Sequence, residues 1–67
     1  INMNNKLKKY FIKYKYTGTY NDAVEGTCIL ELLYTDLNLD SIKRILADEL
    51  KLDCNPLNIE ILLATLL

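Results

Sequence analysis

The sequence predicts an α+β domain of element order β-β-α-β, in which a three-stranded, mainly antiparallel sheet carries one helix packed on one face. Two runs that alternate polar and apolar residues, followed by a run with a period near 3.6, indicate this order. The 67 residues suffice for a single domain, which we assign to residues 3–67. Because 51% of the residues are hydrophobic, a compact core is expected rather than disorder.

The first strand is predicted in "KYFIKYKYT", residues 9–17. Successive side chains in this run alternate between two faces, which is the period of a half-buried strand. One face carries Tyr10, Ile12, Tyr14 and Tyr16, and the other carries Lys9, Phe11, Lys13, Lys15 and Thr17. A helix would scatter the apolar side chains, and aromatic residues favour strands, so we interpret the run as a strand.

The second strand is predicted in "TCILELLYT", residues 27–35, with Leu30 and Leu32 on the face opposite to Ile29 and Leu33. The connecting segment "GTYNDAVEG" is longer than a usual hairpin loop of about two to five residues. The strands can therefore extend into this segment, with Gly26 allowing a β-bulge. Turn-forming residues explain its composition, so we interpret it as a connector and not as a recognition loop.

The helix is predicted in "LNLDSIKRILADELKL", residues 37–52, where the hydrophobic period changes to about 3.6. Asn38 is suited to the N-cap, and Asp40 then lies in the first turn, where the helix dipole favours a negative charge. Pro56 cannot continue a helix, so we expect "DCNP" to close it. The apolar stripe of this helix comprises Leu39, Ile42, Ile45, Leu46 and Leu50.

The final run, "LNIEILLATLL", is almost wholly apolar, and its periodicity does not separate a buried strand from a helix. We choose a strand because the preceding β-β-α needs a third strand to complete its sheet. We favour the order 2-1-3, with the first strand in the centre, because it makes every neighbouring pair antiparallel. The order 1-2-3, with a parallel pair, stays open.

One helix covers only one face of such a sheet, which we predict to be the face of Ile12 and Leu30. The opposite face is then expected to expose a contiguous apolar patch between charged side chains, as at protein interfaces. Its apolar members are Phe11, Ile29 and Leu33, joined by Leu62, Ala64 and Leu66 from the last strand. The candidate protein-binding residues are Phe11, Lys13, Lys15, Ile29 and Leu33.

Catalytic chemistry is not expected. The chain has no histidine, and Asp48 and Glu49 are adjacent on the helix and point apart. Cys28 and Cys54 lack an activating histidine and a C-x-x-C spacing, so we expect two reduced, inert thiols and no metal site. We therefore predict a protein that is not an enzyme and that uses no cofactor and no small-molecule substrate.

Charge is distributed unevenly around a net value of −1: residues 1–17 hold five lysines and no acidic residue. Lysines interleaved with tyrosines resemble surfaces that bind single-stranded nucleic acid. However, the alternation places Lys9, Lys13 and Lys15 on the face opposite to the tyrosines and leaves only Phe11 beside them. Nucleic-acid binding is therefore the weaker alternative.

The two polar-apolar strands, the loop that ends in Gly26, "DLNLDSIKRILADEL" and "NIEILLATLL" together resemble small uncharacterised proteins of bacteriophages and mobile elements of Gram-positive bacteria. The resemblance spans residues 9–67. It implies a β-β-α-β fold and an accessory role in which the protein binds a host or defence protein. It supplies no site residues.

Met3 is interpreted as the initiator, with Ile1 and Asn2 as a preparation remnant. Lys13 and Lys15 interrupt the first apolar run, so we expect no signal peptide, no membrane partner and a location in the cytoplasm of the host bacterium. The predicted function is a non-enzymatic protein-binding module that dimerises or binds a host protein through its uncovered sheet face or a sheet edge. Such a module would act as a phage accessory protein or an anti-CRISPR-like inhibitor. The alternatives are a single-stranded nucleic-acid binder and a phage structural or assembly component.

Overall fold

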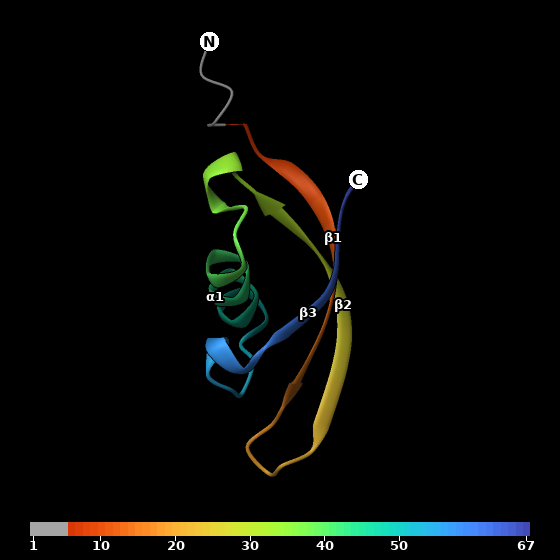
Figure 1. The fold of residues 1–67 in the computed structure, drawn as a ribbon, viewed down its shortest axis with the longest axis vertical. Coiled ribbons are helices and arrows are strands. Elements are labelled where there is room, and N and C mark those ends of the chain that lie inside the picture. Colours follow the sequence, from red (N-terminus) through yellow and green to blue (C-terminus); the bar gives the residue numbers. More distant parts are fainter. Residues whose placement is uncertain (1–5) are drawn as a thin grey trace.

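The computed structural model describes residues 6–67 (Figure 1). In chain order, its elements are β1 (Lys8–Thr17), β2 (Ala23–Leu32), a 3-10 turn (Tyr34–Asp36), α1 (Leu39–Leu50), a second 3-10 turn (Pro56–Asn58) and β3 (Glu60–Leu66). The predictions about Ile1, Asn2 and Met3 lie outside the described residues. No helix within residues 6–67 is long and apolar enough to cross a membrane.

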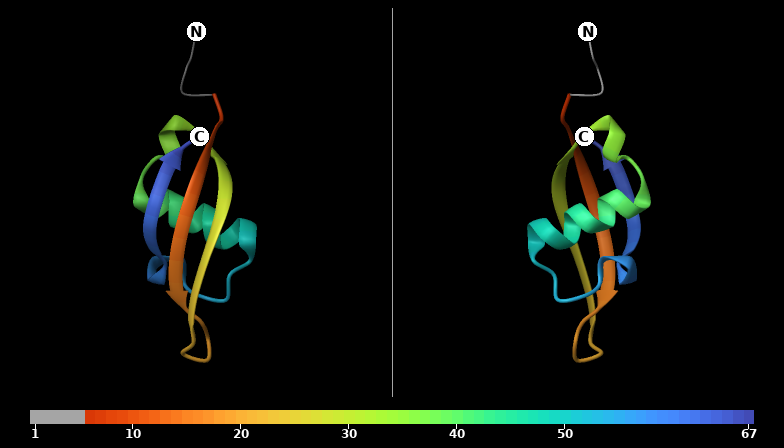
Figure 2. Two further views of the ribbon diagram at one scale, coloured as in Figure 1. Left: turned by 90° about the vertical axis from the view of Figure 1, so that its right-hand side faces the viewer. Right: turned by 90° about the vertical axis from the view of Figure 1, so that its left-hand side faces the viewer.

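The three strands form one sheet of order β2-β1-β3, in which both neighbouring pairs are antiparallel. Figure 2 shows β1 between the two other strands, with α1 on one face. The predicted α+β fold and the central position of the first strand are confirmed, and the parallel order is wrong. The final apolar run forms a strand and not a helix.

The second strand extends into the connecting segment, as the length of that segment predicted. Strand β2 begins at Ala23, four residues before Thr27, because the connection is a hydrogen-bonded turn over residues 18–22. In this turn the Gly18 N–H donates to the Asp22 carbonyl (2.8 Å), and Asn21, in the left-handed region (φ 61°), donates to the Gly18 carbonyl (3.0 Å). The predicted end at residue 35 is wrong, since Tyr34–Asp36 forms the 3-10 turn.

Gly26 is not at a β-bulge. It pairs regularly with Tyr14 across the hairpin, and its φ is not positive. A Cβ at this position would lie 2.7 Å from Tyr14 Cζ, well inside van der Waals contact. The glycine is therefore explained by the space that the Tyr14 ring occupies and not by backbone conformation.

The irregularity of the sheet lies instead in β3. Lys13 faces Leu63, whereas the next residue of β1, Tyr14, faces Ile61, so Leu62 is an extra residue. Such a bulge shifts the alternation of side chains by one residue and reverses the faces of everything that follows it.

As a consequence, Ala64 and Leu66 lie opposite Ile12 and Tyr10, on the face that carries the helix. The prediction that they would join Phe11 on the opposite face is wrong, because a strict period of two does not hold across the bulge. We call the face with the helix the inner face and the other the outer face.

Helix α1 begins as predicted. Its N-cap is Asn38, whose side-chain oxygen accepts a hydrogen bond from the Ser41 N–H (2.9 Å). The helix ends at Leu50, six residues before Pro56, because Lys51 adopts the left-handed conformation (φ 51°) and donates its N–H to the Ala47 carbonyl. Pro56 does not close α1; it begins the following 3-10 turn.

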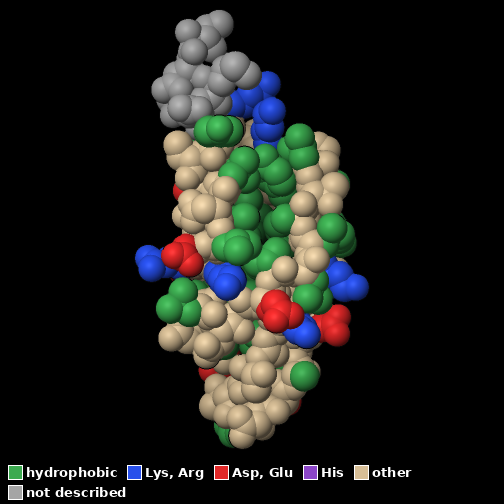
Figure 3. Space-filling view, in the orientation of Figure 1, with side chains coloured by type: hydrophobic (Ala, Val, Ile, Leu, Met, Phe, Trp, Pro, Cys, Tyr) green, Lys and Arg blue, Asp and Glu red, His purple; other side chains and the backbone are tan. Residues whose placement is uncertain are grey.

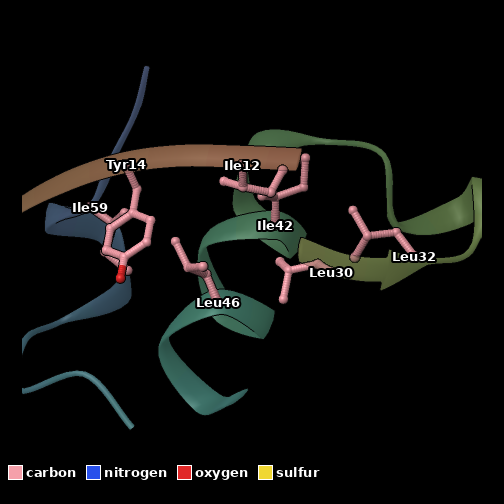
Figure 4. Packing of buried hydrophobic residues seen from close by; sticks show 7 residues of the cluster. All are labelled: Ile12, Tyr14, Leu30, Leu32, Ile42, Leu46 and Ile59. Carbon is pink, nitrogen blue, oxygen red and sulfur yellow. The ribbon is translucent and has the colours of Figure 1, made fainter. Parts of the chain in front are cut away.

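The core lies between the inner face and α1 (Figure 4). Leu46 of the helix is fully buried against strand residues that the sequence assigns to this face, and Ile59 closes the core from the segment before β3. The buried residues are Ile12, Tyr14, Leu30, Leu32, Ile42, Leu46 and Ile59. Leu39 and Leu50, at the two ends of the predicted stripe, are exposed, so the buried stripe is narrower than predicted.

Helix α1 crosses the strands instead of running along them (Figure 2). A helix of 12 residues is about 18 Å long, so in this orientation it spans the width of the sheet but covers only the middle of the strands. At the end where β3 finishes, the β3 side of the inner face is consequently left uncovered, and Ala64 and Leu66 are exposed there, whereas Leu30 and Leu32 of β2 at the same end are buried.

Candidate protein-binding surface

The outer face has Phe11 at its centre. The register places Phe11 of β1 between Ile29 of β2 and Thr65 of β3. Phe11 is half-buried, whereas Ile29 is 59% exposed. Because directly paired residues project on the same side of a sheet, these side chains are neighbours.

The second row of this face consists of Thr27, Lys13 and Leu63, in that order across the sheet. Leu63, which is 48% exposed, adds to the apolar centre. We call Phe11, Ile29 and Leu63 the outer patch. It is smaller than the predicted patch, because threonines and charged residues occupy much of the rest of this face.

Two of the three lysines of the outer face, Lys9 and Lys15, lie opposite carboxylates. Lys15 forms an ion pair with Glu60 (Nζ to Oε2, 3.2 Å) and also lies across from Glu25. Lys9 lies across from Glu31. Exposed pairs of this kind contribute little to stability, but they neutralise the positive charge that a polyanion would need.

Leu33 is the one predicted binding residue that does not belong to the sheet. It follows the last residue of β2 and is half-buried, and its carbonyl accepts a hydrogen bond from the Asp36 N–H (2.9 Å). The structure thus brings Phe11, Lys13, Lys15 and Ile29 onto one face and places Leu33 beyond its end.

A second surface is the free edge of β3. From Ile61 to Leu67 the chain has no charged residue, no proline and no glycine. Leu66 and Leu67 are 53% and 65% exposed, and Ala64 and Thr65 are exposed as well. Figure 3 faces this edge and shows apolar side chains gathered over its upper half, above side chains of both charges.

The hydrogen-bonding phase of β3 follows from one contact, in which the Leu67 N–H donates to the Lys9 carbonyl (3.0 Å). In an antiparallel strand, alternate residues direct both backbone groups to the same side. The backbone N–H and C=O groups of Leu63 and Thr65 therefore point to β1, like the N–H of Leu67. The backbone N–H and C=O groups of Ala64 and Leu66 point to the free edge. No strand within residues 6–67 pairs with that edge.

The edge of β2 differs in its charge. By the same alternation, the residues of β2 that direct backbone groups outward include Glu25, Thr27, Ile29 and Glu31. Charged side chains at an edge oppose pairing with another strand. The sheet therefore has one edge with two carboxylates and one edge without charge beyond Glu60.

The surroundings of the two cysteine thiols do not favour nucleophilic chemistry. Both cysteines are free and half-buried. Burial raises the pKa of the Cys28 thiol, and burial together with the neighbouring Asp53 carboxylate raises the pKa of the Cys54 thiol. Raised values keep both groups protonated and weakly nucleophilic at neutral pH. In the described part of the chain, no three acidic or cysteine side chains gather closely enough to hold a metal ion.

Sequence reasoning missed Leu63 and Thr65 as outer-face residues and the backbone groups of Ala64 and Leu66 as a binding feature. The uncharged run "ILLATLL" was the available signal, but only its side chains were considered as a binding feature and not its backbone groups. Both strand orders weighed from the sequence place this final strand at a sheet edge, where its outward backbone groups are free to pair.

Comparison of the chain with protein-family models, with curated proteins and with solved structures finds no match. The resemblance to phage and mobile-element proteins therefore stays a prediction.

Proposed function

We propose that the protein is a non-enzymatic protein-binding module that binds its partner along the free edge of β3. The observation that carries this proposal is the combination of unpaired backbone groups at Ala64 and Leu66 with exposed, uncharged side chains from Ile61 to Leu67. An edge of this composition is a template for the addition of another strand.

The physical basis of binding is twofold. A partner strand would pair the backbone groups that now face solvent, and these hydrogen bonds would fix its register. The leucine side chains would at the same time lose contact with water, which contributes about 25 cal/mol per Å² of apolar surface. The outer patch adjoins the edge through Leu63 and extends the apolar surface towards Phe11.

Single-stranded nucleic-acid binding is the second candidate, because Lys9, Lys13 and Lys15 do share the outer face with Phe11. Two of these lysines lie across from carboxylates, and the chain as a whole carries a charge of −1. Nucleic-acid affinity falls steeply as salt rises, whereas an apolar edge keeps its partner. The two candidates therefore separate by salt dependence.

The biological setting is proposed on the resemblance alone. An accessory phage protein or an anti-CRISPR-like inhibitor would use such an edge to bind a host protein in the bacterial cytoplasm. A phage structural or assembly component would use it to bind other copies or virion proteins.

The test compares immobilised wild-type protein with Ala64→Pro in the capture of proteins from a Gram-positive lysate, with and without nuclease treatment, at low and high salt. Proline at residue 64 removes a backbone donor that faces the free edge and leaves the donors that bond to β1. The matched control is Ala23→Pro, at the first residue of β2, whose N–H faces the other edge.

We expect wild type and Ala23→Pro to retain the same protein at both salt concentrations and Ala64→Pro to lose it. Equal capture by Ala64→Pro would eliminate the β3 edge as the site. Capture that disappears with nuclease or with salt would favour the nucleic-acid alternative.

A further inference from the structure

We propose that the β3 edge binds the β3 edge of a second copy, antiparallel and centred on Thr65, so that two sheets join into one. This inference rests on the proposed protein-binding function and names the partner. It follows from the hydrogen-bonding phase, the side chains and the charges of β3, taken in turn.

The hydrogen-bonding phase fits a pairing about Thr65. In that register Ala64 lies opposite Leu66 of the second copy, and Leu66 lies opposite its Ala64. These are the residues whose N–H and C=O groups face the free edge, so each pair exchanges two hydrogen bonds. A register shift of one residue would place residues whose backbone groups point to the free edge opposite residues whose backbone groups point to β1. A pairing centred on Ala64 would draw in Leu62, where the bulge makes the backbone irregular.

The side chains also fit. On the outer face, Leu63 would lie opposite Leu67 of the second copy, and the two Thr65 side chains would face each other. On the inner face, the small Ala64 would lie opposite the large Leu66. All of these residues are now exposed, and directly opposed apolar side chains stabilise an antiparallel pair.

Charge selects the direction of pairing. Glu60 is the only charged residue of β3, and it lies at the start of the strand, where Lys15 pairs with it. In the antiparallel arrangement the two Glu60 side chains lie at opposite ends of the joint, beyond the paired residues. A parallel arrangement would bring these like charges close together.

The other edge explains why assembly stops at two copies. Each end of the joined sheet would be a β2 edge, where Glu25 and Glu31 oppose further pairing. The arrangement is a closed two-fold dimer, which does not grow into a filament. Because the joint involves only residues 63–67, it lies at the small end of protein interfaces, and we expect a weak dimer that dissociates on dilution.

The decisive experiment is disulfide cross-linking at Thr65. The two Thr65 residues would form a pair without hydrogen bonds, in which the Cα atoms are about 4.5 Å apart, within the range that a disulfide spans. Thr65→Cys is made in a Cys28→Ala, Cys54→Ala background, oxidised, and examined by non-reducing electrophoresis. The matched control is Thr27→Cys in the same background, an outer-face threonine on the other edge strand.

We expect a covalent dimer with Thr65→Cys and monomer with Thr27→Cys. Sedimentation of the uncross-linked wild type over a dilution series should show a monomer-dimer equilibrium. Ala64→Pro removes two donors from the joint and should weaken the dimer at least about tenfold, whereas Ala23→Pro should leave it unchanged.

A wild type that stays monomeric at every concentration, with no Thr65→Cys cross-link, would overturn the dimer. Cross-linking through Thr27→Cys, or growth beyond two copies, would also overturn it, by implicating the β2 edge. In either case the proposed function would survive if the wild type still captured another protein that Ala64→Pro lost, so the two failures are distinguishable.

Discussion

Replacement of Gly26 by alanine tests the close fit between this residue and the Tyr14 ring. A Cβ at residue 26 would lie 2.7 Å from Tyr14 Cζ and 3.2 Å from Cε1. Tyr14 is buried in the core and pairs directly with Gly26 across the hairpin, so the ring has little room to move away. We therefore expect the substitution to force a rearrangement of the core.

Two opposed effects decide the magnitude. Alanine restricts the unfolded chain, and at a position without positive φ this stabilises the native state by about 0.4–1 kcal/mol. Overpacking of a well-filled core costs about 1–3 kcal/mol. The clash should win, so Gly26→Ala should lower the free energy of unfolding by about 0.5–2 kcal/mol.

Urea unfolding followed by circular dichroism measures this change, provided that the denaturant dependence stays the same between variants. The control is Tyr14→Leu, which lacks the hydroxyl group and the two ring carbons that the new methyl group would meet. In the Tyr14→Leu background the clash is gone, and alanine at residue 26 should stabilise the protein by about 0.4–1 kcal/mol. The sign of the effect is thus expected to reverse.

An equal cost of alanine in both backgrounds would refute the explanation, because the loss would then be independent of the ring. Stabilisation of the wild type by Gly26→Ala would refute it as well, since it would show that the ring accommodates a methyl group without strain.

Two further predictions concern the core and its titratable groups. Leu46→Ala should lower the free energy of unfolding by about 2–5 kcal/mol, because Leu46 is 0% exposed. Leu57→Ala, at a residue that is 58% exposed, should lower it by less than about 0.5 kcal/mol. Similar losses for the two variants in urea unfolding would contradict the packing described. Burial raises the pKa of Cys28 above its ordinary 9.0 and that of Tyr14 above its ordinary 10.0, so the unfolded chain loses these protons first. The stability that these groups contribute should be fully present below pH 9.0 and should be lost as pH rises through the folded-state values. The combined Tyr14→Phe, Cys28→Ala variant should lose stability less steeply over this range, and an unchanged pH profile would rule out these two groups as the cause.

Local patterns in the sequence were enough for the elements and for the inner face. The alternation from Lys9 to Thr17 identified β1, because the period of a strand depends only on its own backbone. Asn38 marked the start of α1, since a cap acts within one turn. The same patterns placed Phe11 and Ile29 together on the outer face.

Local patterns failed where the chain departs from regular geometry. The left-handed conformation of Lys51 ends the helix without a glycine, and the hairpin turn at residues 18–22 sets the start of β2. Both departures are fixed by backbone hydrogen bonds that composition does not reveal. The prediction that Leu33 lies in the second strand is also wrong, because β2 ends at Leu32.

The sequence by itself determined that this chain makes two alternating strands and a capped helix around one core, followed by an apolar final run. Only the tertiary structure decided that the strand order is β2-β1-β3, that a bulge at Leu62 turns Ala64 and Leu66 to the inner face, and that α1 crosses the sheet and leaves them exposed. The reason is physical. Periodicity and capping arise from neighbours along the chain, whereas strand order, bulge position and helix direction depend on how distant side chains pack together.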